Sequence, residues 1–173
     1  MSAAFEVTCS GPAATQAVAA ALARFLQPGD VILLDGDLGA GKTTFTQGLA
    51  RALDVNEVVT SPTFTLVRSY HTSRGFELLH VDVYRLERLA DVIDLALPEF
   101  LEEGAAAVIE WGDKAAPALP PDHLQIRFTF TDDDADRRLT FEAEGPGWEP
   151  RFEEVCVAVA AAAPRLSPRS LRV

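Results

Sequence analysis

Cysteine is scarce in this sequence. Only two of its 173 residues are cysteines, Cys9 and Cys156, and they stand near opposite ends of the chain. No Cys-x-x-Cys pair and no cluster of histidines accompanies them, which excludes a disulfide framework and a cysteine-based metal site. We therefore expect two buried free thiols in a protein of a reducing compartment.

Basic residues are also few. Fifteen Lys and Arg stand against twenty-six Asp and Glu, which gives a net charge of −11 with the histidines neutral. Proteins that grip nucleic acid by themselves neutralise its phosphates with Lys and Arg. The balance disfavours that mode of binding and favours a basic partner.

Long apolar runs are missing as well. The longest, residues 155–163, is far shorter than the ~20 residues that span a bilayer. The N-terminus has neither the basic start nor the apolar stretch of a signal peptide. We expect a cytoplasmic protein without membrane contact, and a monomer when alone.

Length and composition fit one globular domain, because a domain takes about 150 residues on average. We assign residues 1–163 to a single domain. Residues 164–173 are predicted to be a poorly ordered tail. The tail contains Arg165, Arg169 and Arg172. It is either a solvated end or a weak contact to RNA or to an acidic partner surface.

Strand and helix patterns alternate along the chain, which predicts an α/β sheet with flanking helices. The sheet should be parallel in its centre, with antiparallel hairpins added at an edge. Strands are predicted at 5–9, 31–35, 63–70, 76–81, 105–109, 123–131 and 137–143. Helices are predicted from 11 to the Pro-Gly-Asp at 28–30, at 44–53, at 90–103 with an interruption at Pro98, and at 151–163.

A phosphate-binding loop follows the apolar strand at 31–35. The sequence GDLGAGKT at 36–43 fits G-x-x-x-x-G-K-[ST], in which glycines let backbone N–H groups surround a phosphate at a helix start. Lys42 would place its charge on the β- and γ-phosphates, and Thr43 would give its hydroxyl to Mg²⁺. The pattern predicts that ATP or ADP and Mg²⁺ are bound by Asp37, Leu38, Gly39, Ala40, Gly41, Lys42, Thr43 and Thr44.

Two acidic residues stand at the ends of predicted strands, Asp82 after LLHV and Glu110 after AVI. P-loop proteins use such acids to hold the metal or to orient an attacking water. We assign Asp82 to Mg²⁺ and Glu110 to Mg²⁺ or to water positioning, with the two roles exchangeable. Lys42, Asp82 and Glu110 are the predicted catalytic residues. Thr43, Asp82 and Glu110 are the predicted metal-site residues.

Four hydroxyl side chains occur within TSPTFT at 60–65. This segment is either a switch that senses the γ-phosphate or the hydroxyl-rich entry to an edge strand. The spacing alone does not decide between the two.

Three activities remain open at this point: an ATPase, a small-molecule or nucleoside kinase, and a nucleotide-gated binding module. A GTPase is disfavoured because no Asn-Lys-x-Asp motif is present and WGDK at 111–114 does not match it, so ATP is preferred. A small-molecule or nucleoside kinase would need an acceptor pocket with convergent Arg and Asp residues. The only adjacent basic pair, Arg137 and Arg138, lies on an apparent hairpin instead. A nucleotide-gated binding module without useful catalysis is the third possibility.

Four ordered motifs carry a more specific resemblance, from about Thr8 to Phe141. GDLGAGKTT, SPTFTLV, HVDVYRL and IEWGDK resemble the TsaE family, small bacterial ATPases that support threonylcarbamoyl modification of tRNA. The resemblance implies a P-loop fold, slow ATP hydrolysis and action with the proteins TsaD and TsaB. These partners would modify the adenosine beside the anticodon in tRNAs that read codons beginning with A, so the contact with tRNA would be indirect.

The resemblance also implies roles for individual residues. It places Thr43 and Glu110 at Mg²⁺, Asp82 in the catalytic cluster and residues 61–65 in the switch-like loop. Thr15 matches a position near the nucleotide base, and Arg137 is a second candidate there. Trp111 follows Glu110 as in the family, either as a packing residue or in switching or partner contact.

The chain departs from the family pattern at two places. Phe64 stands where the family often has Tyr, which removes a hydroxyl but keeps the ring. At 95–97 the family tends to have a glycine, whereas this chain has Leu-Ala-Leu. The turn at 95–97 is therefore uncertain from the sequence.

Overall fold

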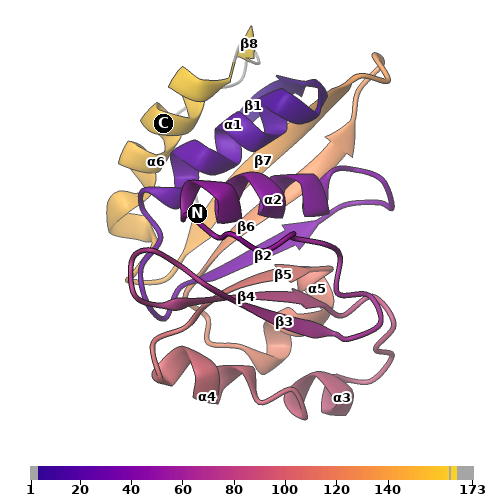
Figure 1. The fold of residues 1–173 in the computed structure, drawn as a ribbon. Coiled ribbons are helices and arrows are strands. Elements are labelled where there is room, and N and C mark those ends of the chain that lie inside the picture. The colour runs from indigo at the N-terminus through magenta and orange to yellow at the C-terminus, as the bar shows by residue number, and fades with distance from the viewer. Residues whose placement is uncertain (1–3, 164, 167–173) are drawn as a thin grey trace.

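Eight strands form one mixed sheet in the order β3-β4-β5-β2-β6-β7-β1-β8 (Figure 1). The computed structural model describes residues 4–163 and 165–166. The strands are β1 (Ala4–Ser10), β2 (Val31–Asp35), β3 (Val67–His71), β4 (Glu77–Asp82), β5 (Ala106–Glu110), β6 (His123–Phe130), β7 (Asp136–Glu144) and β8 (Arg165–Leu166). The α-helices are α1 (Gly11–Ala23), α2 (Lys42–Ala52), α3 (Leu89–Ile93), α4 (Leu97–Glu102), α5 (Gly112–Ala115) and α6 (Phe152–Ala162), and short 3₁₀ helices occupy Ala116–Ala118 and Glu149–Arg151.

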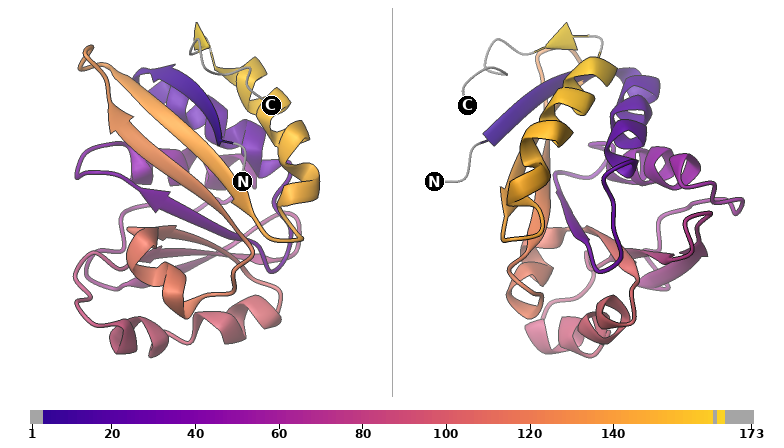
Figure 2. Two further views of the ribbon diagram at one scale, coloured as in Figure 1. Left: turned by 180° about the vertical axis from the view of Figure 1, so that it is seen from behind. Right: turned by 90° about the vertical axis from the view of Figure 1, so that its left-hand side faces the viewer.

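The centre of the sheet is parallel and its outer parts are antiparallel, which confirms the predicted fold class. β4, β5, β2 and β6 run parallel to one another. β3 pairs antiparallel with β4, and β7 pairs antiparallel with β6. The two predicted hairpins thus lie on opposite sides of the sheet rather than at one edge, and each gives one strand to the parallel centre. Figure 2 shows the β6–β7 hairpin projecting beyond the central strands.

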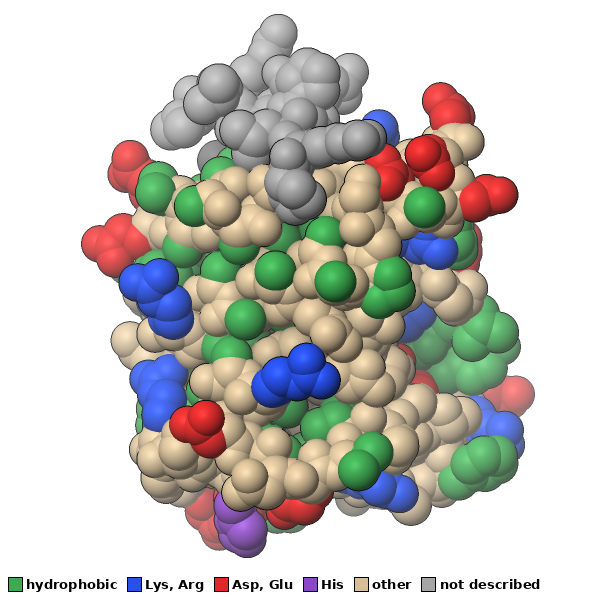
Figure 3. Space-filling model, turned by 45° about the horizontal axis from the view of Figure 1, so that its top comes forward, with side chains coloured by type: hydrophobic (Ala, Val, Ile, Leu, Met, Phe, Trp, Pro, Cys, Tyr) green, Lys and Arg blue, Asp and Glu red, His purple; other side chains and the backbone are tan. Residues whose placement is uncertain are grey.

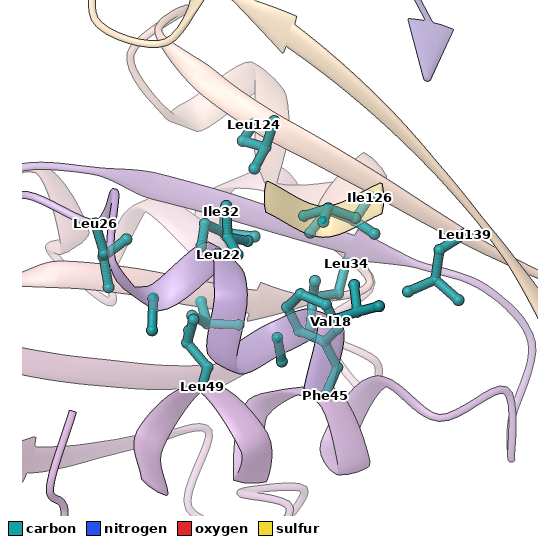
Figure 4. Packing of buried hydrophobic residues seen from close by; sticks show 14 of the residues in the cluster. Val18, Leu22, Leu26, Ile32, Leu34, Phe45, Leu49, Leu124, Ile126 and Leu139 are labelled. Atoms are coloured by element: carbon teal, nitrogen blue, oxygen red, sulfur yellow. The ribbon is translucent and has the colours of Figure 1, made fainter. Parts of the chain in front are cut away.

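Helices cover both faces of the central strands, and every residue of β2 and β5 is therefore buried. Figure 1 shows α1 and α2 above these strands and α3 and α4 below them. Ile32 and Leu34 belong to the core cluster shared with α1 and α2, whereas Val31 and Leu33 belong to the cluster shared with α3 and α4. Figure 4 shows side chains of α1, α2, β2, β6 and β7 meeting in the larger cluster. The strand β2, which leads into the phosphate loop, is therefore close-packed on both faces.

Two predicted boundaries are wrong. The strand predicted at 63–70 begins only at Val67, because Leu66 has a left-handed backbone with φ of 65° and donates its N–H to the carbonyl of Pro62. The first helix ends at Ala23, since the N–H groups of Phe25 and Leu26 bond three residues back instead of four. The segment 61–66 is consequently a turn rather than part of an edge strand.

The helical region predicted at 90–103 is broken earlier than expected. Pro98 lies in the first turn of α4, where proline is compatible with a helix, so it does not interrupt one. The break lies between α3 and α4, where Ala96 has φ of 53° and ψ of 36°. Ala96 thus adopts the left-handed conformation within 95–97, the turn that the sequence left uncertain.

We expect Ala96→Gly to raise the free energy of unfolding by up to about 1 kcal/mol. A left-handed backbone costs a non-glycine residue roughly 1–2 kcal/mol, and the greater freedom of glycine in the unfolded chain returns part of that gain. Urea denaturation measures the change. Ala161→Gly, within α6, is the control and should lower stability instead. A loss of stability in Ala96→Gly would contradict the argument.

The tail and the thiols differ in part from expectation. Arg165–Leu166 pairs with β1 at Thr8 and Val7, so this part of the predicted tail is a strand; the remainder of the tail lies outside the described residues. Both thiols are free; Cys9 is buried as predicted, but Cys156 is only half-buried. Burial raises the pKa of Cys9 to about 11 and that of Cys156 to about 12. Within the described ranges, no helix is long and apolar enough to cross a membrane.

Candidate functional site

The loop 36–43 connects the end of β2 to the first turn of α2. A Cβ atom on Gly36 would lie 2.8 Å from the carbonyl oxygen of Phe128, so only glycine fits there. Gly41 precedes α2 with φ of 107°, a conformation that glycine adopts at little cost. Because the first N–H groups of a helix have no partner within it, this geometry forms an anion-binding corner.

Lys42 is buried at the centre of this loop. Its Nζ donates to the carbonyl oxygens of Gly36 at 2.6 Å and Asp37 at 3.0 Å. The same Nζ lies 4.3 Å from the centre of the Trp111 ring. Burial lowers the pKa of Lys42, and the carboxylates of Glu110 and Asp82 oppose that shift. The cation is therefore held by the loop itself and is directed toward two acids.

The two predicted acids are direct neighbours. Asp82 and Glu110 are paired residues at the carboxyl ends of the parallel strands β4 and β5, and both are buried. Thr43 donates its hydroxyl to Oε1 of Glu110 at 2.7 Å. Asp82 receives the backbone N–H of Tyr84 at 2.9 Å. Glu110 is thus tied to the phosphate loop, whereas Asp82 is tied to the chain that follows β4.

The hydroxyl-rich loop also reaches Asp82. Ser61 and Thr63 each place a hydroxyl 3.2 Å from Oδ2 of Asp82, and their hydroxyl oxygens lie 2.7 Å apart. Phe64, next to them, is 84% exposed, and the guanidinium of Arg85 lies 4.5 Å from the centre of its ring. The segment therefore lies over the acid site, and the strand begins only after it.

Aromatic rings form one wall of the site. The rings of Tyr84 and Trp111 are 4.8 Å apart, and Lys42 lies against the second of them. Trp111 has a left-handed backbone with φ of 62°, which is costly for so large a residue. The backbone N–H of Trp111 donates to the backbone carbonyl of Leu34 at 2.8 Å. This backbone bond fixes the main chain of Trp111, and its partly buried side chain packs against the core cluster shared with α3 and α4. A role of Trp111 in switching or partner contact stays a prediction.

Among the described residues, two cavities adjoin the loop. The larger, about 480 Å³, is lined by Lys42, Thr43, Asp82 and Glu110 together with Ser61, Thr63 and Trp111. The smaller, about 100 Å³, contains Thr15 and Arg137, the two residues expected near the base. Gly39, Gly41 and Thr44 line both cavities, Leu38 lines the larger and Ala40 the smaller. Asp37 lines neither and takes part through its carbonyl oxygen.

Sequence reasoning missed three residues of this site. Tyr84 and Arg85 line the larger cavity, and His80 lies 2.8 Å from Glu110 through its Nε2. All three lie within HVDVYRL, the motif that contains Asp82. The signal for His80 was its position two residues before Asp82, because alternate residues of a strand share a face.

The strand, glycine loop and helix, with two acids at the ends of neighbouring parallel strands, define an α/β protein of the P-loop class. A family model described as "Threonylcarbamoyl adenosine biosynthesis protein TsaE" matches residues 9–139, and the chain belongs to this family.

Related proteins agree with this assignment. The chain is 42% identical over 144 residues to the tRNA threonylcarbamoyladenosine biosynthesis protein TsaE of Bacillus subtilis, which covers 83% of this chain and 89% of that protein. It is 41% identical over 132 residues to the protein of the same name from Streptomyces coelicolor, covering 73% and 88%. The crystal structure of Bacillus subtilis YdiB is similar with a TM-score of 0.73 and 34% identity, over 93% of this chain and 97% of that one.

Proposed function

We propose that this protein binds ATP with Mg²⁺ and hydrolyses it slowly, in support of TsaB and TsaD. These partners would form N6-threonylcarbamoyladenosine next to the anticodon of tRNAs that read codons beginning with A. The observation that carries the proposal is the convergence of Lys42, Thr43, Asp82 and Glu110 on one cavity beside the glycine loop. The names of the relatives support the biosynthetic role.

The donor set beside the loop fits Mg²⁺. Thr43, Glu110 and Asp82 offer only oxygen atoms, and Mg²⁺ at phosphate sites uses one or two carboxylates together with phosphate oxygens and water. Thr43 with one of the two acids would hold the ion. When bound, Mg²⁺ neutralises charge on the β- and γ-phosphates.

The remaining residues have separable roles in the proposal. Lys42 would exchange its bonds to the carbonyls of Gly36 and Asp37 for phosphate oxygens. The acid that does not hold the metal would orient the attacking water. Ser61 and Thr63 would sense the γ-phosphate through their contact with Asp82. Thr15 and Arg137 would contact the base in the smaller cavity.

The charge of the chain fits an indirect role toward tRNA. The net charge is −11, and on the face in Figure 3 the Lys and Arg side chains are separated while acidic side chains gather at one upper corner. A surface of this kind disfavours direct binding of the tRNA backbone and suits a basic protein partner. The protein would therefore act in the cytoplasm as a monomer that joins the partner complex, where the partners supply the tRNA contact.

Steady-state ATP hydrolysis by the purified chain, alone and with TsaB and TsaD, tests the proposal. Slow turnover that rises when the partners are added is the expected result. Turnover that ignores the partners but requires a small acceptor, with phosphate transferred to it, would favour a kinase. Nucleotide binding without hydrolysis under either condition would favour a binding module.

Asp82→Asn and Glu110→Gln should separate the two acids. Because Thr43 bonds to Glu110 and the hydroxyl loop bonds to Asp82, we expect Glu110→Gln to weaken Mg²⁺-dependent nucleotide binding. Asp82→Asn should retain that binding but lower turnover by ~10²-fold or more, as loss of a preorganised catalytic group does. Titration with a fluorescent ADP analogue and steady-state hydrolysis are the measurements. The opposite pattern would exchange the two roles.

We further propose that hydrolysis resets the partner complex and is not part of the carbamoyl-transfer chemistry. A single round of tRNA modification should then proceed when this protein holds a non-hydrolysable ATP analogue, whereas repeated rounds should require ATP. If even the first round requires hydrolysis, the reset model is wrong.

A further inference from the structure

His80 is a buried polar residue beside the acid site that none of the roles above uses. It lies on β4, two residues before Asp82, and its side chain has no exposed surface. Its Nε2 is 2.8 Å from Oε1 of Glu110. Its Nδ1 is buried and has no hydrogen-bond partner within the described part of the chain. The Nε2 contact with Glu110 is therefore the hydrogen bond through which His80 can act.

The oxygen that His80 contacts is shared with the phosphate loop. Oε1 of Glu110 lies 2.8 Å from Nε2 of His80 and 2.7 Å from Oγ1 of Thr43. An ionised carboxylate only accepts hydrogen bonds, so both neighbours must donate to it. This assigns the proton of a neutral His80 to Nε2 and directs the hydroxyl proton of Thr43 toward Glu110.

The direction of that proton matters for the chemistry of Thr43. A hydroxyl has one proton and two lone pairs. When Thr43 donates its proton in the hydrogen bond to Glu110, its lone pairs are free for a cation. If Glu110 turned away, the hydroxyl would rotate and its proton would compete with the cation for the same space. The orientation of the Glu110 carboxylate therefore determines whether the hydroxyl of Thr43 can offer a lone pair to a cation.

We propose that His80 is a positioning residue that fixes the carboxylate of Glu110 and, through it, the hydroxyl of Thr43. The inference rests on the proposed binding of Mg²⁺ and nucleotide at this loop. Stability alone does not account for His80, because its Nδ1 is buried without a hydrogen-bond partner among the described residues. A polar atom left in this state costs about 1–3 kcal/mol. An apolar side chain of similar size would avoid that cost.

The test measures nucleotide affinity with and without Mg²⁺, using mant-ADP as the fluorescent probe. We expect His80→Leu to lose roughly 10–100-fold in affinity with Mg²⁺ present, as removal of residues that orient metal ligands does. Affinity in EDTA should stay near the wild-type value. His80→Gln, which keeps an N–H donor within reach of Glu110, should restore most of the loss. His71→Leu is the matched control, because that histidine is on the surface with a side chain 84% exposed.

A double-mutant cycle with Thr43→Val tests whether His80 acts through Thr43. In the Thr43→Val background, His80→Leu should have little further effect, because the hydroxyl that His80 orients is gone. The inference is overturned if His80→Leu lowers affinity equally with Mg²⁺ and in EDTA, if it changes neither, or if its effect persists in Thr43→Val. If His80→Leu does not fold, His80→Asn replaces it, since its shorter amide does not reach Glu110.

Probe binding and ATP hydrolysis by the wild-type protein distinguish a failure of this inference from a failure of the proposed ATPase activity. If it binds Mg²⁺ and mant-ADP but does not hydrolyse ATP, the ATPase proposal fails, and the variants still decide the role of His80. If it does not bind the probe at all, both proposals are wrong.

Discussion

Lys42→Ala is expected to lower ATP turnover by ~10²-fold or more. The variant removes a buried cation that lies at the phosphate loop and opposite two carboxylates. A preorganised charge aimed at the transition state contributes on this scale. Steady-state phosphate release, measured with and without TsaB and TsaD, gives the ratio of turnover to the wild type.

Lys114→Ala is the matched control for this experiment. Lys114 is a second lysine near Trp111, but its Nζ is 5.9 Å from the ring centre and donates to the carbonyl of Tyr84 at the surface. Turnover close to wild type is expected from it. Equal losses in both variants would mean that positive charge near Trp111, and not the position of Lys42 in the loop, determines turnover.

Arg151→Met is expected to lower the free energy of unfolding by about 3–5 kcal/mol. Arg151 donates to Oδ2 of Asp30 at 2.9 Å and to the carbonyl of Phe25, and its guanidinium lies 4.0 Å from the Trp148 ring. The side chains of Arg151 and Asp30 are 12% and 9% exposed. Removing one partner of a buried pair leaves an uncompensated charge, which is the costly case. Urea denaturation at neutral pH measures the loss.

The pH dependence of this loss provides a second check. Burial raises the pKa of Asp30, and the hydrogen bonds from Arg151 oppose that rise. Without Arg151 the pKa should rise further, so the protonated form of Asp30 is favoured in the folded state. A folded-state pKa above the unfolded value stabilises at low pH, and this stability is lost as pH rises through the folded pKa. The deficit of Arg151→Met should therefore shrink toward acid pH.

Arg88→Met is the control for the buried pair. Arg88 bonds to Asp91 at 2.8 Å, but its side chain is 78% exposed. Exposed ion pairs contribute little because water screens them, so no measurable change in stability is expected. A large loss in Arg88→Met, or none in Arg151→Met, would contradict the distinction between the two pairs.

Much of the site follows from local sequence. The glycine pattern at 36–43 predicts a phosphate loop, and the structure shows why glycine stands at two of its positions: a Cβ would clash at Gly36, and Gly41 has a positive φ. The acids at the ends of β4 and β5 were identified because parallel strands end at the same edge of a sheet. The two acids lie side by side because β4 and β5 are neighbours in the sheet and Asp82 pairs with Glu110. The order of these elements was thus sufficient to group Lys42, Asp82 and Glu110.

Other parts did not follow from local patterns. The β-forming residues at 63–66 favoured a strand, but the hydroxyls of Ser61 and Thr63 bond to Asp82 and Leu66 turns the chain. Local propensity was overridden there by contacts from a distant strand. Similarly, the left-handed Ala96 has no signature of its own, because alanine normally favours a helix.

The sequence by itself determined the P-loop class from its glycine pattern and the family from four ordered motifs. It also predicted Lys42, Thr43, Asp82 and Glu110 for the site, but not Tyr84, Arg85 or His80. Position in the glycine loop or at the end of a strand is enough to predict those four residues, since parallel strands end at the same edge of a sheet. Only the tertiary structure decided which hydrogen-bond partners distinguish Glu110 from Asp82. Thr43 and His80 hold Glu110, while Ser61 and Thr63 hold Asp82. These partners come from separate elements, and hydrogen bonds between distant segments depend on atomic positions that the folded chain alone sets.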